Sequence, residues 1–408
     1  MEMQYAFLTR LIPEQLEECV DRCSKNNMQD AANALQWHIY NGLCKNLNSE
    51  IQIINLLPIG SFPQYYKKPF VSNTKFDTEY CKKNINIGFL NLKLIRKISQ
   101  TNCVYNSLKR WYRQTKNPKT LFVYTASAVF VKALSKIKKI YPALNICIIV
   151  ADLPDMSSLS SKKVWGQKIL GKYLSAVSYA GLECIDSFVL LTKHMADYMQ
   201  IDKPYCIMEG ISTDTGRYKR DNCPAKLEKT IFYAGTLHRR FGVLNLLAAF
   251  QLIDNPEYRL IICGIGDSEK EIKSAAQNDP RIRYLGKVSR DEVLRIQQNV
   301  TVLVNPRQNI EEFTKYSFPS KNLEYLSAGI PVIAYKLDGI PDEYDEYFYY
   351  VETNDIAALK NKLVEVCEMD SALRAEKAEK SRRFVHENKN EVIQTKKIIA
   401  MLNEIGVI

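Results

Sequence analysis

The chain has 408 residues, of which 46% are hydrophobic and 25% charged, and its formal net charge is +11. That length is too great for one compact core and predicts two domains, on a prior of roughly 100–200 residues per domain. The composition is that of a globular protein, and no apolar run approaches the ~20 residues of a membrane-spanning helix.

The first half alternates between strand and helix patterns. It opens with Tyr5–Leu11, which is apolar, is predicted to be a strand and has no basic region before it, so no signal peptide is expected. The other strands are predicted from short apolar runs and the helices from apolar residues at helical spacing. Strands are expected at Ile51–Leu57, Ile85–Leu94, Leu121–Tyr124, Ile146–Val150, Phe188–Leu191 and Cys206–Met208, and helices at Gln29–Leu43, Ala128–Lys138, Lys162–Tyr179 and up to Met199.

The polar segment Thr213–Lys229 is interpreted as a linker between a first domain, residues 1–212, and a second, residues 230–387. The alternation then restarts. Strands are expected at Thr230–Ala234, Tyr258–Cys263, Ile282–Leu285, Thr301–Asn305 and Pro331–Ala334, and helices at Leu244–Leu252, Glu269–Gln277, Arg290–Gln298, Ser320–Ala328, Asp355–Cys367, Ala372–Glu387 and Val392–Leu402. This pattern predicts an α/β fold with two doubly wound, Rossmann-like domains facing across a cleft. The last helix, within residues 388–408, is a candidate to pack back on the first domain.

The positive charge is concentrated in the first half. No Asp or Glu occurs from Tyr80 to Ala151, and Lys162, Lys163, Lys168 and Lys172 follow before the acid at Glu183. A basic surface of this kind attracts anionic membranes, phosphorylated substrates or nucleic acid, or simply keeps the protein soluble. Nucleic acid is not expected as a partner, because no aromatic–basic interleaving or helix-turn-helix pattern is present.

The cysteines indicate neither a disulfide framework nor a metal site. There are 11 of them, no Cys-x-x-Cys pair occurs, and the chain has only four histidines. We therefore expect reduced thiols in a reducing cytoplasm.

Three segments of the second half carry candidate chemistry. Tyr233–Val243 runs from a strand through Gly235 into a loop with two arginines, which can neutralise a pyrophosphate. Ile261–Asp267 is a strand that enters a Gly-x-Gly turn. Taken alone, the first segment is as compatible with an ordinary basic loop as with a ligand site, and the second with a tight turn.

The third segment contains Asn305-Pro306-Arg307 and then Phe318–Ala334. Loop amides and Ser320 lie at a predicted helix start, which suits phosphate. Lys321 and Glu324 share a helix face, and a carboxylate there can accept two hydrogen bonds from a ribose diol. The alternative is a capped helix with a surface ion pair, which the ordered series of glycine and proline junctions disfavours.

Residues 230–342 resemble the donor-binding domain of the family 4 glycosyltransferases, which have the GT-B fold. The resemblance rests on Tyr-Ala-Gly-Thr-Leu, Ile-Cys-Gly-Ile-Gly, Asn-Pro-Arg, Phe-Pro-Ser-Lys and Glu-Tyr-Leu-Ser-Ala-Gly-Ile-Pro-Val-Ile-Ala, in this order. Asp338-Gly339-Ile340-Pro341 further resembles members that build bacterial capsules and exopolysaccharides. Over the first half the resemblance is architectural only.

The resemblance assigns roles residue by residue. It implies donor or nucleotide binding by Gly235, Thr236, Gly264, Gly266, Tyr316, Ser317, Phe318, Pro319, Ser320 and Glu324, and catalytic roles for Arg239, Arg240, Lys321 and Asp152. Three positions depart from the family pattern: Tyr316 replaces a glutamate, Phe241 a lysine and Ala151 a histidine. Asp152 is also compatible with a plain turn role in its Asp-Leu-Pro-Asp loop.

The resemblance further implies a sugar transfer that retains anomeric configuration and needs no metal or other cofactor. The expected donor is a UDP-sugar, and the expected acceptor is a polyprenyl-diphosphate-linked or growing saccharide at the inner face of the cytoplasmic membrane, where the protein would be peripheral. Two alternatives stay open: a GT-B sugar-nucleotide epimerase, and a non-catalytic GT-B partner of a polysaccharide-synthesis complex.

Overall fold

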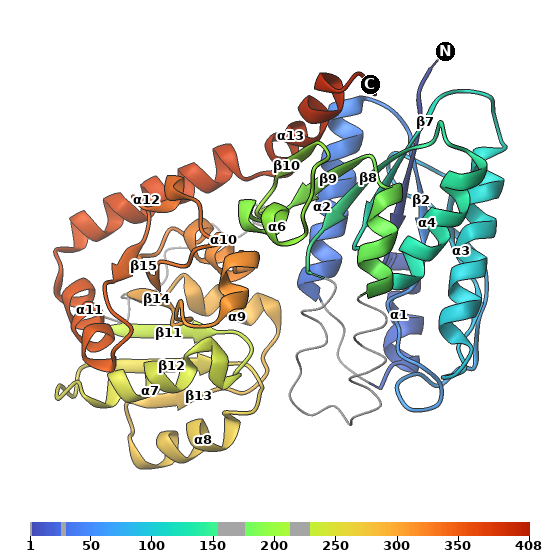
Figure 1. Ribbon diagram of the computed structural model, residues 1–408. Coiled ribbons are helices and arrows are strands. Elements are labelled where there is room, and N and C mark those ends of the chain that lie inside the picture. The colour runs from blue at the N-terminus through green and yellow to red at the C-terminus, as the bar shows by residue number, and fades with distance from the viewer. Residues whose placement is uncertain (1, 26–29, 154–175, 213–228) are drawn as a thin grey trace. The chain divides into compact units, whose positions relative to one another are not determined.

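The computed structural model describes residues 2–25, 30–153, 176–212 and 229–408 (Figure 1). These residues form two compact units. Unit 1 comprises Met1–Ile211 together with Glu391–Ile408, and unit 2 comprises Ser212–Asn390. Most of the predicted helix Lys162–Tyr179, and all of the predicted linker except Lys229, lie outside the described residues.

Unit 1 contains an eight-stranded sheet in the order β10-β9-β8-β7-β1-β2-β5-β4. All neighbours are parallel except β4 and β5, which are antiparallel. Its strands are β1 (Gln4–Thr9), β2 (Ile51–Asn55), β4 (Thr74–Phe76), β5 (Asn84–Asn86), β7 (Lys119–Tyr124), β8 (Asn145–Val150), β9 (Ser187–Leu190) and β10 (Tyr205–Ile207). The short strands β3 (Phe70–Val71) and β6 (Phe89–Leu90) pair separately.

The helices of unit 1 follow from apolar stripes that pack on this sheet. Tyr5 and Phe7 of β1 share one core cluster with α2 and α13, as alternating strand residues should. Helices α3 and α4 pack against each other. The unit 1 helices are α1 (Glu14–Cys23), α2 (Asp30–Leu47), α3 (Arg96–Tyr112), α4 (Ala128–Ile140), α6 (Lys193–Tyr198) and α13 (Glu391–Glu404), with the 3-10 turn η2 at Gly181–Cys184.

The C-terminal helix α13 belongs to the core of unit 1. It lies along α2, where a Cβ on Gly42 would come within 2.3 Å of the Glu391 carbonyl oxygen, so the two helices approach closely. Glu391 accepts from His38 Nδ1 at 2.8 Å and from Lys45 Nζ at 2.7 Å. Ile398 and Leu402 of the same helix are fully buried. The chain therefore leaves unit 1, forms unit 2 and returns.

Unit 2 contains a six-stranded sheet, parallel throughout, in the order β13-β12-β11-β14-β15-β16. Its strands are β11 (Thr230–Ala234), β12 (Arg259–Cys263), β13 (Ile282–Tyr284), β14 (Val302–Asn305), β15 (Val332–Tyr335) and β16 (Tyr349–Val351). The helices are α7 (Val243–Gln251), α8 (Glu269–Asn278), α9 (Arg290–Gln297), α10 (Ser320–Ser327), α11 (Ile356–Glu368) and α12 (Ser371–Asn388), and the 3-10 turns are η3 (Arg239–Phe241), η4 (Glu312–Tyr316) and η5 (Asp342–Tyr344).

The strand order of unit 2 indicates at which edge of the sheet a ligand would bind. Helix α7 lies against α11 and α10 against α12. Connections run outward in both directions from the adjacent strands β11 and β14, so the topology switches between them. In open α/β sheets ligands bind outside the carboxyl ends of strands at such a switch point.

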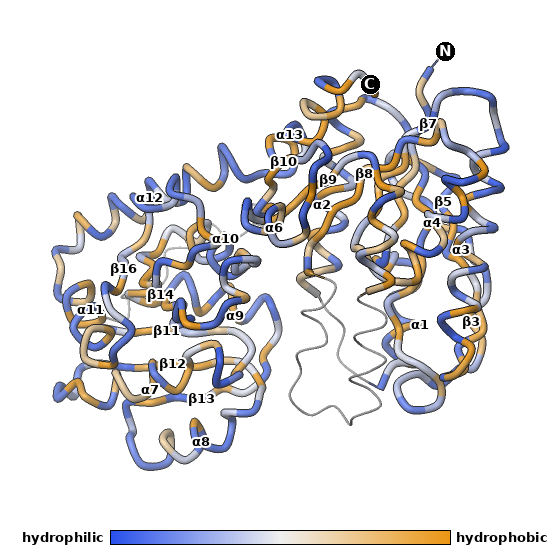
Figure 2. Tube along the Cα trace, in the orientation of Figure 1, coloured by the Kyte–Doolittle hydropathy of each residue, from blue (hydrophilic) through white to orange (hydrophobic). Residues whose placement is uncertain are grey.

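The structure confirms the predicted α/β class with parallel sheets, and the strands are largely apolar (Figure 2). The predicted single strand Ile85–Leu94 is wrong: Asn84–Asn86 joins the main sheet, and Phe89–Leu90 turns away to pair with Phe70–Val71. Gly88 lies between these two short strands. The backbone of Val71 approaches it so closely that a Cβ on residue 88 would lie 2.6 Å from the Val71 carbonyl oxygen. Helix α3 was not predicted. Within the described ranges, no helix has both the length and the apolar character that crossing a membrane requires.

Candidate functional site

The loops at the carboxyl edge of the unit 2 sheet are packed backbone against backbone. Gly242 has a φ of +78°, and a Cβ on it would lie 1.9 Å from the carbonyl oxygen of Pro306. Gly264 has a φ of +132°, and its Cβ would lie 1.8 Å from the Gly235 carbonyl oxygen. Only glycine fits these two positions, so the loops after β11, β12 and β14 form one compact edge.

Helix α10 is fixed to this edge by a buried tyrosine. The hydroxyl of Tyr325 accepts from the amide of Ala234 at 2.9 Å and donates to its carbonyl at 3.1 Å. Ala234 is the last residue of β11, directly before Gly235. The buried Asn305, at the end of β14, also donates to Asn322 of α10 at 2.7 Å. The N-terminal end of α10 is thereby held at the switch point between β11 and β14.

A cluster of two arginines and two aromatic rings occupies the loops after β11 and β14. We call it the Arg307 cluster: Arg240, Phe241, Arg307, Phe313 and Ser317. The Arg307 guanidinium lies 4.4 Å from the ring centre of Phe313 and 5.6 Å from that of Phe241. The Arg240 guanidinium lies 5.4 Å and 5.1 Å from the same two rings. Such contacts orient a guanidinium without neutralising it.

Arg307 is a buried cation. The residue is 9% exposed, and among the described residues no carboxylate pairs with it or with Arg240. Its Nη2 donates to Ser317 Oγ at 2.8 Å, whereas its buried Nε has no hydrogen-bond partner. Burial, together with the neighbouring Arg240, lowers the pKa of Arg307 to about 10. The cluster thus holds positive charge that no carboxylate of the described residues neutralises, which suits binding of an anion.

The two sequence-predicted arginines of the first loop are placed differently. Arg239 forms an ion pair with Glu271 of α8, and its amide donates to Asp267 at 3.0 Å. Arg240 lies in the Arg307 cluster instead. The structure therefore brings together Arg240 and Arg307, while the charge of Arg239 is already balanced on the protein surface.

A second polar cluster lies on α9 and α10. We call it the Glu324 cluster: Gln297, Lys321 and Glu324. Lys321 Nζ and Gln297 Nε2 each donate to Glu324 Oε1 at 2.9 Å. The Glu324 side chain is 15% exposed and Lys321 36% exposed. Both bonds converge on one carboxylate oxygen, which leaves Oε2 to accept from a ligand.

Glu324 is held in its charged form. Burial by itself would raise the pKa of Glu324, but the Lys321 ammonium and the two hydrogen bonds outweigh burial and place the pKa below the ordinary 4.5. A carboxylate fixed as an anion is an acceptor only, which suits recognition of a diol.

The other predicted donor-site residues form the loop before α10. Phe318 is buried and packs on Tyr344 at 5.2 Å between ring centres, so its side chain anchors the loop from the core. Tyr316 is half-buried, with its hydroxyl 3.3 Å from Glu312 Oε1. Ser317 receives the Arg307 bond. Pro319 is buried at the N-cap of α10, and Ser320 follows it, exposed at the helix start.

The remaining glycine-loop residues frame the same edge. Thr236 is exposed, and its carbonyl accepts from the Tyr233 hydroxyl at 3.0 Å. Gly266 comes so close to Leu237 that a Cβ would lie 2.4 Å from the carbonyl of that residue. Gly235 and Gly264 are in mutual contact, as described above. The glycines contribute backbone shape to this edge, and Thr236 is an exposed residue on it.

Asp152 belongs to unit 1 and is described there alone. It lies in a bend just after β8, with its side chain still reaching solvent. Desolvation by the surrounding chain raises the pKa of Asp152. Burial, and to a smaller extent the Asp152 charge, raises the pKa of Tyr124. In the described part of the chain, no three His, Cys, Asp or Glu side chains gather as a metal site would require.

Sequence reasoning identified the Asn-Pro-Arg segment but did not assign Arg307 to the candidate site. The available signal was an arginine two residues after a buried strand end at a switch point. Its pairing with Phe313 and Phe241 depends on the 3-10 turn η4, which the sequence pattern did not predict. Gln297 was likewise predicted only as part of a helix.

Comparison with known proteins bears on this geometry. Residues 215–390 match the family model of glycosyl transferases group 1. The matched segment, which is less than half of the chain, is similar to glycosyl transferases group 1 and contains both clusters. That similarity supports sugar transfer as the activity. No curated protein matches the sequence.

Solved structures share the fold over nearly the whole chain. Sucrose-phosphate synthase from Thermosynechococcus elongatus has a TM-score of 0.66 at 14% identity, covering 99% of each chain. The E. coli trehalose-6-phosphate structure bound with UDP-2-fluoro glucose has a TM-score of 0.64 at 9% identity, covering 98% of this chain and 99% of that chain. WaaG, a glycosyltransferase involved in lipopolysaccharide biosynthesis, has a TM-score of 0.59 at 14% identity, covering 98% and 100%. These likenesses confirm the GT-B glycosyltransferase fold.

Proposed function

We propose that the protein is a GT-B glycosyltransferase of family 4 that transfers a sugar from a UDP-sugar to a lipid-linked or growing saccharide. The observation that carries the proposal is the Arg307 cluster. It places two guanidinium groups, which no carboxylate of the described ranges pairs with, beside the carboxyl edge of a Rossmann-like sheet. A nucleoside diphosphate is the anion that such an edge commonly accommodates.

The two clusters divide the donor between them. Glu324 would accept hydrogen bonds from the ribose diol, since its pKa is lowered and no donor of the described residues bonds its Oε2. Arg240 and Arg307 would hold the diphosphate, together with amides at the start of α10. The E. coli neighbour, which is bound with UDP-2-fluoro glucose, supports UDP as the nucleotide.

The transfer would proceed with retention of configuration and without a metal. The departing diphosphate gains negative charge in the transition state, and fixed cations aimed at it lower the barrier. Arg240, Arg307 and Lys321 would supply that stabilisation. The acceptor hydroxyl would pass its proton to the leaving phosphate oxygen, and Asp152, whose pKa is raised, would assist.

The acceptor side of the proposal concerns unit 1 and cellular location. The acid-free stretch from Tyr80 to Ala151 supports an anionic surface as partner. We propose capsule or exopolysaccharide assembly on a polyprenyl diphosphate carrier, with the protein peripheral at the inner face of the cytoplasmic membrane. Vesicle co-sedimentation should then show binding to anionic lipid that weakens at high salt.

Release of UDP tests the activity itself. The purified protein is incubated with single UDP-sugars and bacterial membrane extract, and UDP is measured over time. Sugar-dependent release that requires the extract is expected, with loss in an Arg307→Met variant. A non-catalytic partner would bind UDP without releasing it from any UDP-sugar, and an epimerase would interconvert UDP-sugars without the extract.

A further inference from the structure

Unit 1 exposes a row of large apolar side chains around the start of α3. We call it the apolar ridge: Phe70, Leu90, Leu92, Leu94, Ile95 and Ile98. Leu94 is 91% exposed, Ile98 64% and Phe70 50%. Single exposed apolar residues are normal, but six from neighbouring segments form a patch, and patches of this kind mark interaction surfaces.

The ridge stands on a rigid support. Phe70 and Leu90 are directly paired across β3 and β6. Between them and α3, the fully buried Asn91 donates to the carbonyls of Gly60 at 3.0 Å and Lys68 at 3.3 Å. The amide of Leu90 donates to Ser99 Oγ at 3.0 Å. The exposure of these side chains is therefore imposed by a well-bonded backbone and is not the result of a fraying segment.

Basic side chains accompany the ridge. Lys93, Arg96 and Lys97 alternate with its apolar residues, and no acid occurs within the whole stretch from residue 80 to 151. Arg96 Nε is buried without a partner. Burial and the neighbouring Arg96, Arg10 and Lys132 lower the pKa of Lys97. In the part of the chain that the structure describes, no carboxylate forms an ion pair with Lys93, Arg96 or Lys97.

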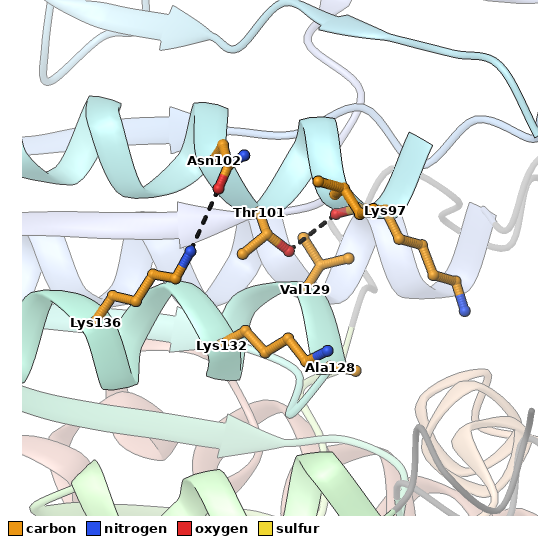
Figure 3. A pocket seen from close by; sticks show the side chains of 8 residues that line it. Lys97, Thr101, Asn102, Ala128, Val129, Lys132 and Lys136 are labelled. Atoms are coloured by element: carbon orange, nitrogen blue, oxygen red, sulfur yellow. Dashed lines mark hydrogen bonds between the residues drawn. The ribbon is translucent and has the colours of Figure 1, made fainter. Parts of the chain in front are cut away.

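A pocket adjoins the ridge between α3 and α4 (Figure 3). Its volume is about 220 Å³, and Ile98 of the ridge forms part of its wall. Lys97, Lys132 and Lys136 also line it, with Lys136 reaching Asn102 Oδ1 at 3.4 Å across the two helices. A pocket of this size, walled by lysines and lacking acids, fits a phosphate group next to an apolar chain.

We propose that the apolar ridge inserts into an anionic lipid bilayer while the adjoining lysine pocket binds the phosphate of a lipid headgroup. Apolar side chains flanked by lysines have the composition of an interfacial membrane contact. Lys93, Arg96 and Lys97 lie among these apolar residues and complement the negative surface of an anionic bilayer. The inference rests on the proposed membrane location, and it names the residues that would make the membrane contact.

Vesicle binding of ridge variants tests the insertion. Leu94→Ser and Ile98→Ser should each weaken binding to vesicles of mixed phosphatidylglycerol and phosphatidylcholine by about tenfold, because each removes one large apolar side chain that the bilayer would bury. Both side chains are exposed, so the variants should fold as the parent does. Leu373→Ser, at a leucine 58% exposed in unit 2, is the matched control and should bind as the parent does.

A fluorescent reporter adds a direct readout. Tryptophan in Leu94→Trp should shift its emission to shorter wavelength with phosphatidylglycerol vesicles and be quenched by brominated acyl chains. Lys97→Gln with Lys132→Gln should weaken binding to phosphatidylglycerol several-fold more than Lys139→Gln, an exposed lysine on α4 outside the pocket.

The outcomes are distinguishable. If the parent binds anionic vesicles but the ridge variants bind equally well, the ridge assignment is overturned while the membrane location stands. If the parent binds no vesicle, both fall, although UDP release can still establish sugar transfer. If Leu94→Ser instead converts a dimer to a monomer in sedimentation, the ridge is an interface between two copies, and the lipid proposal is wrong.

Discussion

Arg307 donates one hydrogen bond, from Nη2 to Ser317 Oγ at 2.8 Å, while its buried Nε donates none. Ser317 in turn donates to the carbonyl of Phe313 at 3.1 Å, and the Phe313 ring covers the same guanidinium. The Ser317 hydroxyl and the Phe313 ring thus orient the Arg307 guanidinium, but neither of them neutralises its charge.

Replacing Arg307 with methionine should weaken UDP binding by roughly 10- to 100-fold, the range for losing charged hydrogen bonds to an anion. Uridine, which has no phosphate, should bind as before. Because burial and Arg240 lower the pKa of Arg307 to about 10, its charge destabilises the empty protein. The variant should therefore be at least as stable to urea. Calorimetry with UDP and uridine measures the difference, and equal loss for both ligands would indicate a structural role.

The two neighbouring arginines should differ in their kinetic effects. Arg240→Gln should lower kcat far more than it raises the Michaelis constant for the donor, since its charge acts on the leaving diphosphate. Arg239→Gln should have a small effect, because Arg239 is exposed and ion-paired with Glu271. Steady-state UDP release gives both parameters. The opposite ranking would return the diphosphate role to Arg239.

Glu324→Ala should weaken nucleotide binding by about 1–3 kcal/mol, the usual effect of losing a charged hydrogen-bond partner. The loss should be large for UDP and small for 2′-deoxy-UDP, because the carboxylate is expected to hold the ribose diol. Glu257→Ala, at a glutamate paired with Lys229 before β12, is the control. Unchanged discrimination between the two nucleotides in a folded variant would remove the ribose assignment.

The pH dependence of stability should reveal the Lys321–Glu324 pair. The folded-state pKa of Glu324 is lowered, so its stabilising contribution is present above the unfolded value near 4.5 and is lost as pH falls through the folded value. The difference in unfolding free energy between parent and Glu324→Gln should stay constant above about pH 5 and shrink below it. Urea unfolding from pH 3 to 7 measures it. A difference that grows on acidification would contradict the lowered pKa.

Gly242→Ala should destabilise unit 2 and weaken UDP binding, because the new Cβ combines positive-φ strain with a clash against the Pro306 carbonyl. Gly286→Ala provides the control: its φ is +66°, but a Cβ would meet only the Tyr284 hydroxyl, at 4.0 Å. Gly242→Ala should lower the thermal unfolding temperature by more than the control does. Equal decreases in unfolding temperature would show that backbone strain alone determines the effect and that the contact between Gly242 and Pro306 is not tight.

The sequence was sufficient for elements whose apolar residues are continuous. Thr230–Ala234 has the predicted bounds because every residue of that strand is buried. Helix α3 escaped prediction because it is largely polar and its buried positions include Gln100 and Thr101. The region Ile85–Leu94 was predicted as one strand because it is mostly apolar. Its apolar residues in fact belong to two different sheets and to the exposed apolar ridge.

The candidate site divides in the same way. Lys321 and Glu324 are three apart on one helix, so their contact follows from helical periodicity. Arg307, Phe313 and Phe241 come from separate loops, and their contact depends on glycine-mediated packing that no spacing rule encodes. The family resemblance predicted the same catalytic role for Arg239 and Arg240. The structure distinguishes the two residues, because Arg239 is ion-paired with Glu271 and Arg240 lies in the Arg307 cluster.

The return of residues 391–408 to unit 1 has a consequence for synthesis of the protein. Ribosomes make the chain from its N-terminus, so unit 2 is complete before α13 emerges. Until then, the apolar face of α2 that packs against Ile398 and Leu402 lacks its helical partner. Unit 1 is therefore the first domain to begin folding and the last to finish. A nonsense mutation near codon 390 would leave the donor domain whole while depriving nascent unit 1 of its final helix.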